Sequence, residues 1–206
     1  MPRVSLQSFS KVVMQSIKDF GQQIVVNPIV GLLLRLKIPP NVITFSSLAF
    51  ALVAFLFYRS GTFWIGAIFL FLCGIFDTLD GEIARRTQKV TKLGGFLDST
   101  IDRVNEFIIY FGLFCYYYGK ENYVLFWILL AIFGSMMVSY TRARAEGLGI
   151  SPQVGIFARF TRFLFLIIGS FLGPRIMIYA LVILAIGTMQ TTLQRIIFVQ
   201  HQSVKR

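Results

Sequence analysis

The stretch from Asp77 to Asp102 reads DTLDGEIARRTQKVTKLGGFLDSTID and places four aspartates beside long apolar segments. The four are Asp77, Asp80, Asp98 and Asp102. A carboxylate is costly in apolar surroundings unless a proton or a cation neutralises its charge. The stretch therefore predicts a charged site held between two membrane helices.

The composition of the chain points to one membrane domain. Of its 206 residues, 56% are hydrophobic, which exceeds the share of about 45–50% usual in soluble domains. The chain has a net charge of +11. In a membrane protein such a surplus of lysine and arginine indicates cytoplasmic loops and contacts with anionic lipid headgroups. No basic, aromatic-bearing soluble module is present, so we expect no nucleic-acid partner. Cys73 and Cys115 lie in apolar runs and cannot build a disulfide framework or a zinc site.

Apolar stretches predict an all-α fold, an integral membrane six-transmembrane-helix bundle. They cover residues 42–58, 62–76, 104–118, 123–141, 163–173 and 176–199. A span needs about 20 residues, so the shorter stretches must extend through polar residues that line a cavity. Lysine and arginine gather before the first stretch, after the second, after the fourth and at the end of the chain. The positive-inside rule then predicts a multi-pass protein of the cell membrane, with both termini and the aspartates on the cytoplasmic side.

A different pattern precedes the first span and predicts an N-terminal amphipathic juxtamembrane helix. Apolar residues recur there at a spacing of three or four: Phe9, Val13, Ile17, Phe20 and Ile24. Asn27-Pro28 ends this helix, and a short second helix through Leu32–Leu36 stops at Pro39-Pro40. We expect residues 1–38 to form this segment, 39–200 the membrane domain and 201–206 a polar tail. Whether the first helix only anchors the chain or also shapes the substrate site stays open.

Helical spacing brings the four aspartates together. Residues on one stripe of the first helix are Asp77, Asp80, Gly81, Ala84 and Arg85, and on the second helix Gly94, Asp98 and Asp102. The polar link 86–92 is short enough to make the two helices antiparallel neighbours. We therefore expect the four carboxylates to converge.

Oxygen ligands without histidine or cysteine favour a hard cation such as Mg²⁺, Mn²⁺ or Ca²⁺. Small residues beside the acids leave space for a nucleotide or phosphate, and Arg85 offers a fork that suits a phosphate oxygen. Two other hypotheses use the same acids: a cation or proton transporter, and a non-catalytic membrane scaffold. The small residues and the arginine favour an enzyme, because a transporter has little use for a nucleotide-sized gap.

These residues carry a resemblance to a known family. The stretch resembles the signature D-x2-D-G-x2-A-R-x8-G-x3-D-x3-D of the CDP-alcohol phosphotransferases, and it matches every fixed position and spacing. The lead-in Pro40-Asn41-Val42-Ile43-Thr44 is similar to the P-N-x-[IVL]-T segment of that family. The predicted surface helix followed by six spans is also similar to the family's arrangement.

The resemblance implies an enzyme that transfers a phosphatidyl group from a CDP-linked lipid, usually CDP-diacylglycerol, to an alcohol and releases CMP. It implies two divalent ions, Mg²⁺ or Mn²⁺, held by Asp77, Asp80, Asp98 and Asp102. Asp98 and Asp102 would be catalytic, with Asp102 as general base. The resemblance assigns the CDP-lipid to Asn41, Val42, Ile43, Thr44, Gly81, Ala84, Arg85, Thr91 and Gly94. The lipid tails would remain among membrane lipids, and a homodimer is expected.

The acceptor alcohol is predicted from a group of arginines on the cytoplasmic side. They are Arg142, Arg144, Arg159, Arg162 and Arg195, and they suggest a pocket for a phosphorylated acceptor, although positive-inside bias explains any single one. The segment SYTRARAE from Ser139 to Glu146 resembles S-Y-x-K-A-R-A-E of the phosphatidylinositol phosphate synthases within the family. Arg142 replaces the lysine common there, which keeps the charge and changes the shape. Inositol phosphate is therefore favoured, with glycerol 3-phosphate, the acceptor of phosphatidylglycerophosphate synthases, as the alternative.

Two further charged residues follow the last aspartate. Arg103 and Glu106 are three positions apart, so we expect a structural ion pair between them on one helix; the alternative is a role in setting the charge of Asp102.

Overall fold

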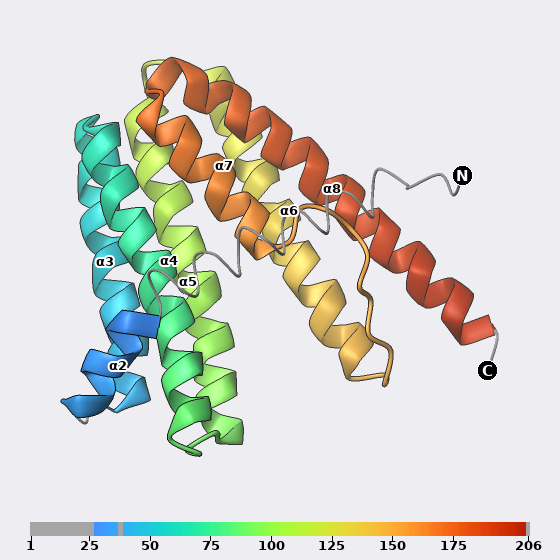
Figure 1. The fold of residues 1–206 in the computed structure, drawn as a ribbon. Helices are drawn as coiled ribbons and strands as arrows, with labels where there is room; N and C mark the ends of the chain where they lie inside the picture. Colours follow the sequence, from blue (N-terminus) through green and yellow to red (C-terminus); the bar gives the residue numbers. More distant parts are fainter. Residues whose placement is uncertain (1–26, 37–38, 205–206) are drawn as a thin grey trace, which may run out of the picture.

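The structure, a computed structural model, describes residues 27–36 and 39–204 (Figure 1). This part of the chain is helical and contains no strand. Its helices are α2 (Asn27–Arg35), α3 (Pro40–Ser60), α4 (Phe63–Arg86), α5 (Lys92–Tyr117), α6 (Asn122–Glu146), α7 (Arg159–Phe171) and α8 (Pro174–Val204). The predicted amphipathic helix at Phe9–Ile24 lies outside the described residues.

Each of the six predicted apolar stretches falls on one helix, in chain order from α3 to α8, and only residues 62, 118, 172 and 173 lie just outside the helices. The predicted short helix through Leu32–Leu36 is α2, which begins at Asn27 and ends at Arg35. Pro28 does not break α2, because the first turn of a helix leaves its N–H groups without helical partners and so tolerates proline. Pro40 likewise stands in the first turn of α3.

Four helices of the described chain are long and apolar enough to cross a membrane: α3, α4, α6 and α8. The chain is therefore a membrane protein. Helix α5 has 26 residues, but its first half carries the acidic and basic residues of the motif. Helix α7 has only 13 residues. By length and hydropathy, α3, α4, α6 and α8 qualify as membrane spans in the described part of the chain, and α5 and α7 do not.

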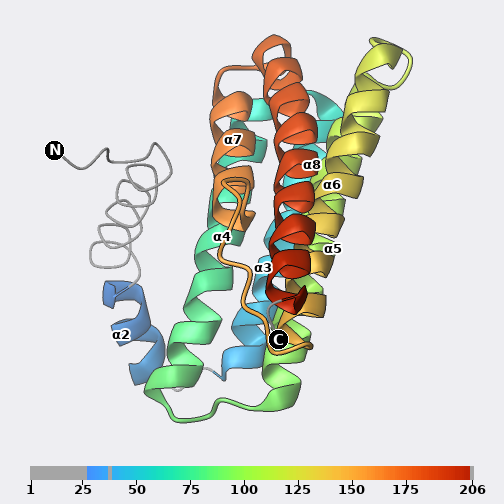
Figure 2. The same ribbon diagram turned by 90° about the vertical axis from the view of Figure 1, so that its right-hand side faces the viewer.

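The helices form one elongated bundle in which α3, α4 and α5 pack together and α6 packs along α8 (Figures 1 and 2). Helix α7 lies between α4 and α8. The link from α4 to α5, the end of α6 and the end of α8 lie at the same end of the bundle, which we call the motif end (Figure 2). Helix α2 lies beside α4 near this end, where Val30 is buried against Ile43, Leu79 and Ile83.

Helix α7 begins inside the bundle and not at its end. After α6, residues 147–158 run back from the motif end to the middle of the molecule (Figure 2). The Phe157 N–H donates a hydrogen bond to Thr191 Oγ1 at 3.3 Å, which ties this segment to α8. A Cβ atom at Gly187 would lie 2.3 Å from the Phe157 ring, so glycine lets the ring reach α8. The segment takes the place of the first part of a full-length span, which explains the shortness of α7.

Helix α8 comes close to α6 at Gly134, where a Cβ atom would lie 2.8 Å from Thr188 Cβ. We predict that Gly134→Ala lowers the free energy of unfolding by about 1–3 kcal/mol, because the added methyl group overpacks this contact. Thermal unfolding in detergent measures the change. Gly31→Ala is the matched control, since a Cβ atom at Gly31 meets nothing within 4 Å. Equal melting temperatures for the two variants would contradict the prediction.

Candidate active site

Three of the four predicted aspartates form a cluster between α4 and α5. Asp77, Asp98 and Asp102 each offer one carboxylate oxygen, and these oxygens lie within 4.8 Å of one another. The antiparallel helices and the one-turn spacing of Asp98 and Asp102 produce this arrangement. Several oxygens at this separation are a suitable donor set for one hard divalent cation, so these residues fit a metal ion.

Asp80 lies apart from that cluster and faces α3. It is buried, and its Oδ2 accepts a hydrogen bond from Thr44 Oγ1 at 2.5 Å. The same threonine hydroxyl lies 3.2 Å from the Pro40 carbonyl oxygen. The predicted lead-in segment and the aspartate motif are thus joined directly, by a contact that connects the start of α3 to α4.

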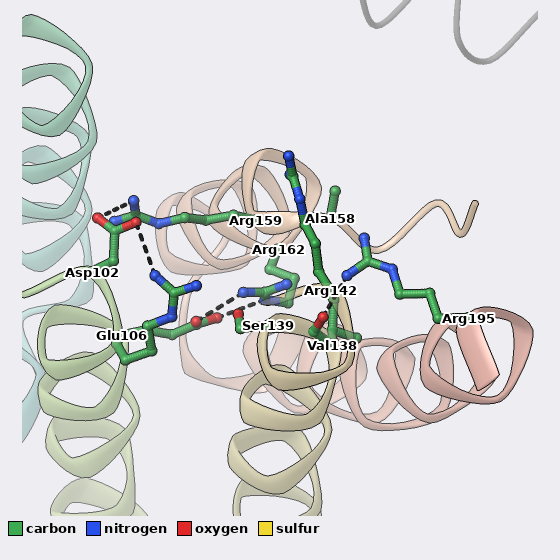
Figure 3. Close-up of a pocket in the computed structure, with 10 residues that line it drawn as sticks. Asp102, Glu106, Val138, Ser139, Arg142, Ala158, Arg159, Arg162 and Arg195 are labelled. Atoms are coloured by element: carbon green, nitrogen blue, oxygen red, sulfur yellow. Dashed lines mark hydrogen bonds and ion pairs between the residues drawn. The ribbon is translucent and has the colours of Figure 1, made fainter. Parts of the chain in front are cut away.

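Arg159, the first residue of α7, reaches into the acidic cluster. Its Nη1 lies 2.7 Å from Asp77 Oδ2. The same nitrogen also pairs with Asp102 Oδ1 (Figure 3). The guanidinium group therefore supplies positive charge to one carboxylate on α4 and one on α5. Sequence reasoning assigned Arg159 to the acceptor phosphate only, and its contact with the aspartates was not predicted.

The residues predicted to hold the CDP group surround the start of α5 and the end of α4. Thr91 caps α5, since its Oγ1 accepts a hydrogen bond from the Gly94 N–H at 2.9 Å. The side chain of Arg85 is 64% exposed and pairs with Glu82 at 2.9 Å, so it is accessible to a ligand. Gly81 and Ala84 are partly buried on the same helix. In the lead-in segment, Asn41 and Val42 are exposed and Ile43 is buried.

A cavity of about 140 Å³, partly open to solvent, adjoins the acidic cluster (Figure 3). Asp102 belongs to both, and Arg159 lines the cavity and pairs with the cluster. Four of the five predicted arginines line this cavity: Arg142, Arg159, Arg162 and Arg195. Arg144 is exposed near the end of α6 and does not line it. Ser139, Arg103 and Glu106 contribute further polar atoms to the wall.

The cavity arginines differ in how far protein groups already engage them. Arg142 pairs with Glu146 at 2.8 Å on an exposed face of α6. Arg195 donates hydrogen bonds to the carbonyl oxygens of Val138 and Val154. Arg162 is buried and donates to both carboxylate oxygens of Glu106, at 2.7 and 2.9 Å.

The predicted ion pair between Arg103 and Glu106 was wrong. Glu106 is paired with Arg162, whereas Arg103 donates to the Ser99 carbonyl oxygen and lies 3.6 Å from Asp102 Oδ2. Glu106 points toward α7, where a buried guanidinium offers two hydrogen bonds in place of one exposed contact. One signal in the sequence was available: Glu106 follows Asp102 by four residues, and Arg162 follows Arg159 by three.

Comparisons with known proteins identify the family. The sequence model of the CDP-alcohol phosphatidyltransferases matches residues 37–201. The chain belongs to this family of enzymes, which confirms the resemblance inferred from the motif. The archaetidylinositol phosphate synthase of Methanothermobacter thermautotrophicus is 40% identical over 169 residues, covering 80% of this chain and 85% of that protein. The phosphatidylinositol phosphate synthase of Cutibacterium acnes is 38% identical over 145 residues, covering 68% and 69%.

Solved structures of the Mycobacterium tuberculosis phosphatidylinositol phosphate synthase have the same fold at 26% sequence identity. The structure with CDP-DAG bound has a TM-score of 0.77 and covers 85% of this chain and 93% of that one. The structure in complex with manganese and citrate has a TM-score of 0.79 and covers 85% and 89%. The manganese complex agrees with a divalent metal as the cofactor of this fold.

We predict that Arg159→Gln increases the affinity for Mn²⁺ by about threefold or more, because the guanidinium competes with a cation for Asp77 and Asp102. Electron paramagnetic resonance of free Mn²⁺ during a titration of purified protein measures the dissociation constant. Arg144→Gln is the control, since Arg144 is exposed outside the cavity. Unchanged or weaker binding by the Arg159 variant would show that no such competition exists.

Proposed function

We propose that this protein transfers a phosphatidyl group from CDP-diacylglycerol to inositol phosphate and releases CMP. This proposal rests on the contact between the acidic cluster and the arginine-lined cavity: Asp102 belongs to both, and Arg159 of the cavity pairs with Asp77 and Asp102 of the cluster. A donor diphosphate beside the acids would then meet a phosphorylated alcohol in the cavity. The names of the two relatives and the CDP-DAG complex of the structural neighbour support the same reaction.

Asp77, Asp98 and Asp102 would hold the metal, and Asp80 would join them for a second ion if its side chain turns from Thr44. When bound, two divalent ions, Mg²⁺ or Mn²⁺, would neutralise the diphosphate and polarise the phosphorus under attack. The part of the chain around Asn41–Thr44, with Gly81, Ala84, Arg85, Thr91 and Gly94, would hold the CDP group. Exposed Arg85 is suited to a phosphate oxygen, because its guanidinium offers a planar pair of donors.

Asp102 is the proposed general base because it lies where the cluster meets the cavity. Its carboxylate would take the proton of the acceptor hydroxyl group while that oxygen attacks the lipid-bearing phosphorus. A new bond then forms between phosphorus and the acceptor oxygen. The bond between that phosphorus and the bridging oxygen of the diphosphate breaks, and the electron pair leaves with CMP.

Inositol phosphate is favoured over glycerol 3-phosphate as the acceptor. Arg142 and Arg195 line the cavity from α6 and α8, and Arg159 lies on its side next to the acids. Such a set of cations suits a phosphate group. The names of the two relatives, which are synthases of inositol phosphate lipids, favour inositol phosphate as that acceptor. Glycerol 3-phosphate carries the same charge, so only a direct assay separates the two acceptors.

The membrane arrangement follows from the same proposal. Helices α3 to α8 would form the six-span domain of residues 39–200, with α5 and α7 spanning because their polar residues face the site. The segment 1–38 would lie on the membrane surface and 201–206 would be a polar tail. Both termini and the active site would be cytoplasmic, and two copies would form a homodimer.

The experiment is an assay of CMP release by purified protein with CDP-diacylglycerol and Mg²⁺ or Mn²⁺. We expect release with inositol phosphate, much less with glycerol 3-phosphate, and none after chelation of the metal. Release with glycerol 3-phosphate alone would establish the alternative acceptor. Absence of release with any phosphorylated alcohol would overturn the proposal.

Asp98→Asn and Asp102→Asn should each reduce kcat by roughly 100-fold or more, because each removes a charge required by the metal or the base. Glu121→Gln is a matched control, since Glu121 lies in the connection between α5 and α6, at the end opposite the motif. Thermal unfolding in detergent verifies that each variant is folded. Normal turnover in both aspartate variants would contradict the assigned roles.

Arg142→Ala should raise the KM for the phosphorylated acceptor by about tenfold and change the KM for the CDP-lipid much less, since it removes a charged hydrogen-bond donor from the cavity. Arg144→Ala, on the same helix end but outside the cavity, should have a clearly smaller effect. Steady-state kinetics with each substrate varied in turn measures both constants. Equal effects of the two substitutions would contradict the assignment of the cavity to the acceptor.

A further inference from the structure

A second carboxylate–guanidinium pair lies one helical turn away from the pair between Asp102 and Arg159. Glu106 and Arg162 form it, with both carboxylate oxygens accepting hydrogen bonds (Figure 3). Because Glu106 is four residues after Asp102, and Arg162 three after Arg159, the two pairs connect the same faces of α5 and α7. We call them the outer pair (Asp102 and Arg159) and the inner pair (Glu106 and Arg162).

The two pairs differ in exposure. In the inner pair, the side chains of Arg162 and Glu106 are 1% and 2% exposed. In the outer pair, those of Arg159 and Asp102 are 27% and 14% exposed. The inner pair is therefore held away from solvent in one geometry, whereas the outer pair is accessible from the cavity.

Arg162 also fixes the backbone just before α7. Its Nη1 donates to the Phe157 carbonyl oxygen at 3.1 Å, and the Phe157 N–H donates to Thr191 on α8. Arg159 is two residues after Phe157 and one turn before Arg162. The Arg162 guanidinium thus holds the backbone on both sides of Arg159: before it through the Phe157 carbonyl oxygen, and after it through its own pairing with Glu106.

We infer that Glu106 and Arg162 are positioning residues, which set the height of α7 against α5 so that Arg159 meets both the aspartates and the acceptor phosphate. This inference rests on the proposed function. It separates Arg162 from the other cavity arginines: Arg162 binds Glu106, and Arg159 binds the ligand. A buried ion pair contributes little net stability. We therefore assign the inner pair the role of fixing the position of α7 relative to α5.

The test removes both charges at once, in Glu106→Gln/Arg162→Gln, because loss of one partner would leave a buried unpaired charge. We expect the KM for inositol phosphate to rise roughly tenfold, with a much smaller change in the KM for CDP-diacylglycerol. We also expect tighter Mn²⁺ binding, in the direction of Arg159→Gln, since Arg159 is no longer held at Asp77 and Asp102. A merely structural role would not produce this gain.

A triple variant that adds Arg159→Gln measures the coupling. If the inner pair acts through Arg159, the triple variant has the acceptor KM and the Mn²⁺ affinity of Arg159→Gln alone. Multiplied effects would show that the two pairs act independently and would overturn the inference. So would a folded double variant with the acceptor KM of the original protein.

Tyr58→Phe is the matched control for a loosened α7. It removes the buried 2.8 Å hydrogen bond between Tyr58 on α3 and Ser170 near the other end of α7. We expect no change in the acceptor KM; a rise equal to that of the double variant would overturn the inference. If the double variant is not recovered folded, Glu106→Asp replaces it. This substitution keeps both charges but shortens the side chain, so the carboxylate moves away from Arg162. It should raise the acceptor KM and tighten Mn²⁺ binding, as expected for the double variant.

The Mn²⁺ titrations need no substrate. If the unsubstituted protein releases no CMP with inositol phosphate, the proposed function fails, whereas the Mn²⁺ affinities of the double and triple variants still decide whether the inner pair positions Arg159. Unchanged Mn²⁺ affinity in a folded double variant would overturn the inference while leaving the CMP assay intact.

Discussion

Carboxylate and guanidinium groups face one another where α4, α5 and α7 meet, inside a bundle whose outer surface is largely apolar. Charges in such surroundings must be balanced by nearby opposite charges. Asp77, Asp102 and Glu106 therefore require the two arginines of α7 at the same depth. This requirement accounts for the unusual course of the chain, in which residues 147–158 return from the motif end so that α7 begins beside the acids.

The same balance places two sites side by side. Asp102 is a member of the acidic cluster and also a wall of the cavity, and Arg159 contacts the cluster from the first turn of α7. An anion that enters the cavity would attract Arg159, and a cation that enters the cluster would repel it. Both forces would move Arg159 away from Asp77 and toward the anion. Charge alone would then couple the two sites, without a rearrangement of the helices.

The sequence predicted the features that depend on local spacing. One-turn repeats identified the facing aspartates, and the apolar stretches identified six of the helices. Contacts between distant segments could not be predicted from the spacing of residues in the sequence. Glu106 and Arg162 are 56 residues apart, and the nearer Arg103 offered Glu106 an equally plausible partner by spacing. The bond between Thr44 and Asp80 joins two motifs that were each recognised, but helical spacing says nothing about which side chains meet across two helices.

Three of the arginines that entered the positive-inside count lie within the bundle. Arg159, Arg162 and Arg195 line the cavity, so they are not loop charges and should be left out of that count. Without these three and Arg142, which also lines the cavity, the basic residues near the motif end still include Arg86, Lys89, Lys92 and Arg144, against Arg59, Lys120 and Arg175 near the opposite end. The bias keeps its sign, so the predicted orientation does not depend on the arginines of the site.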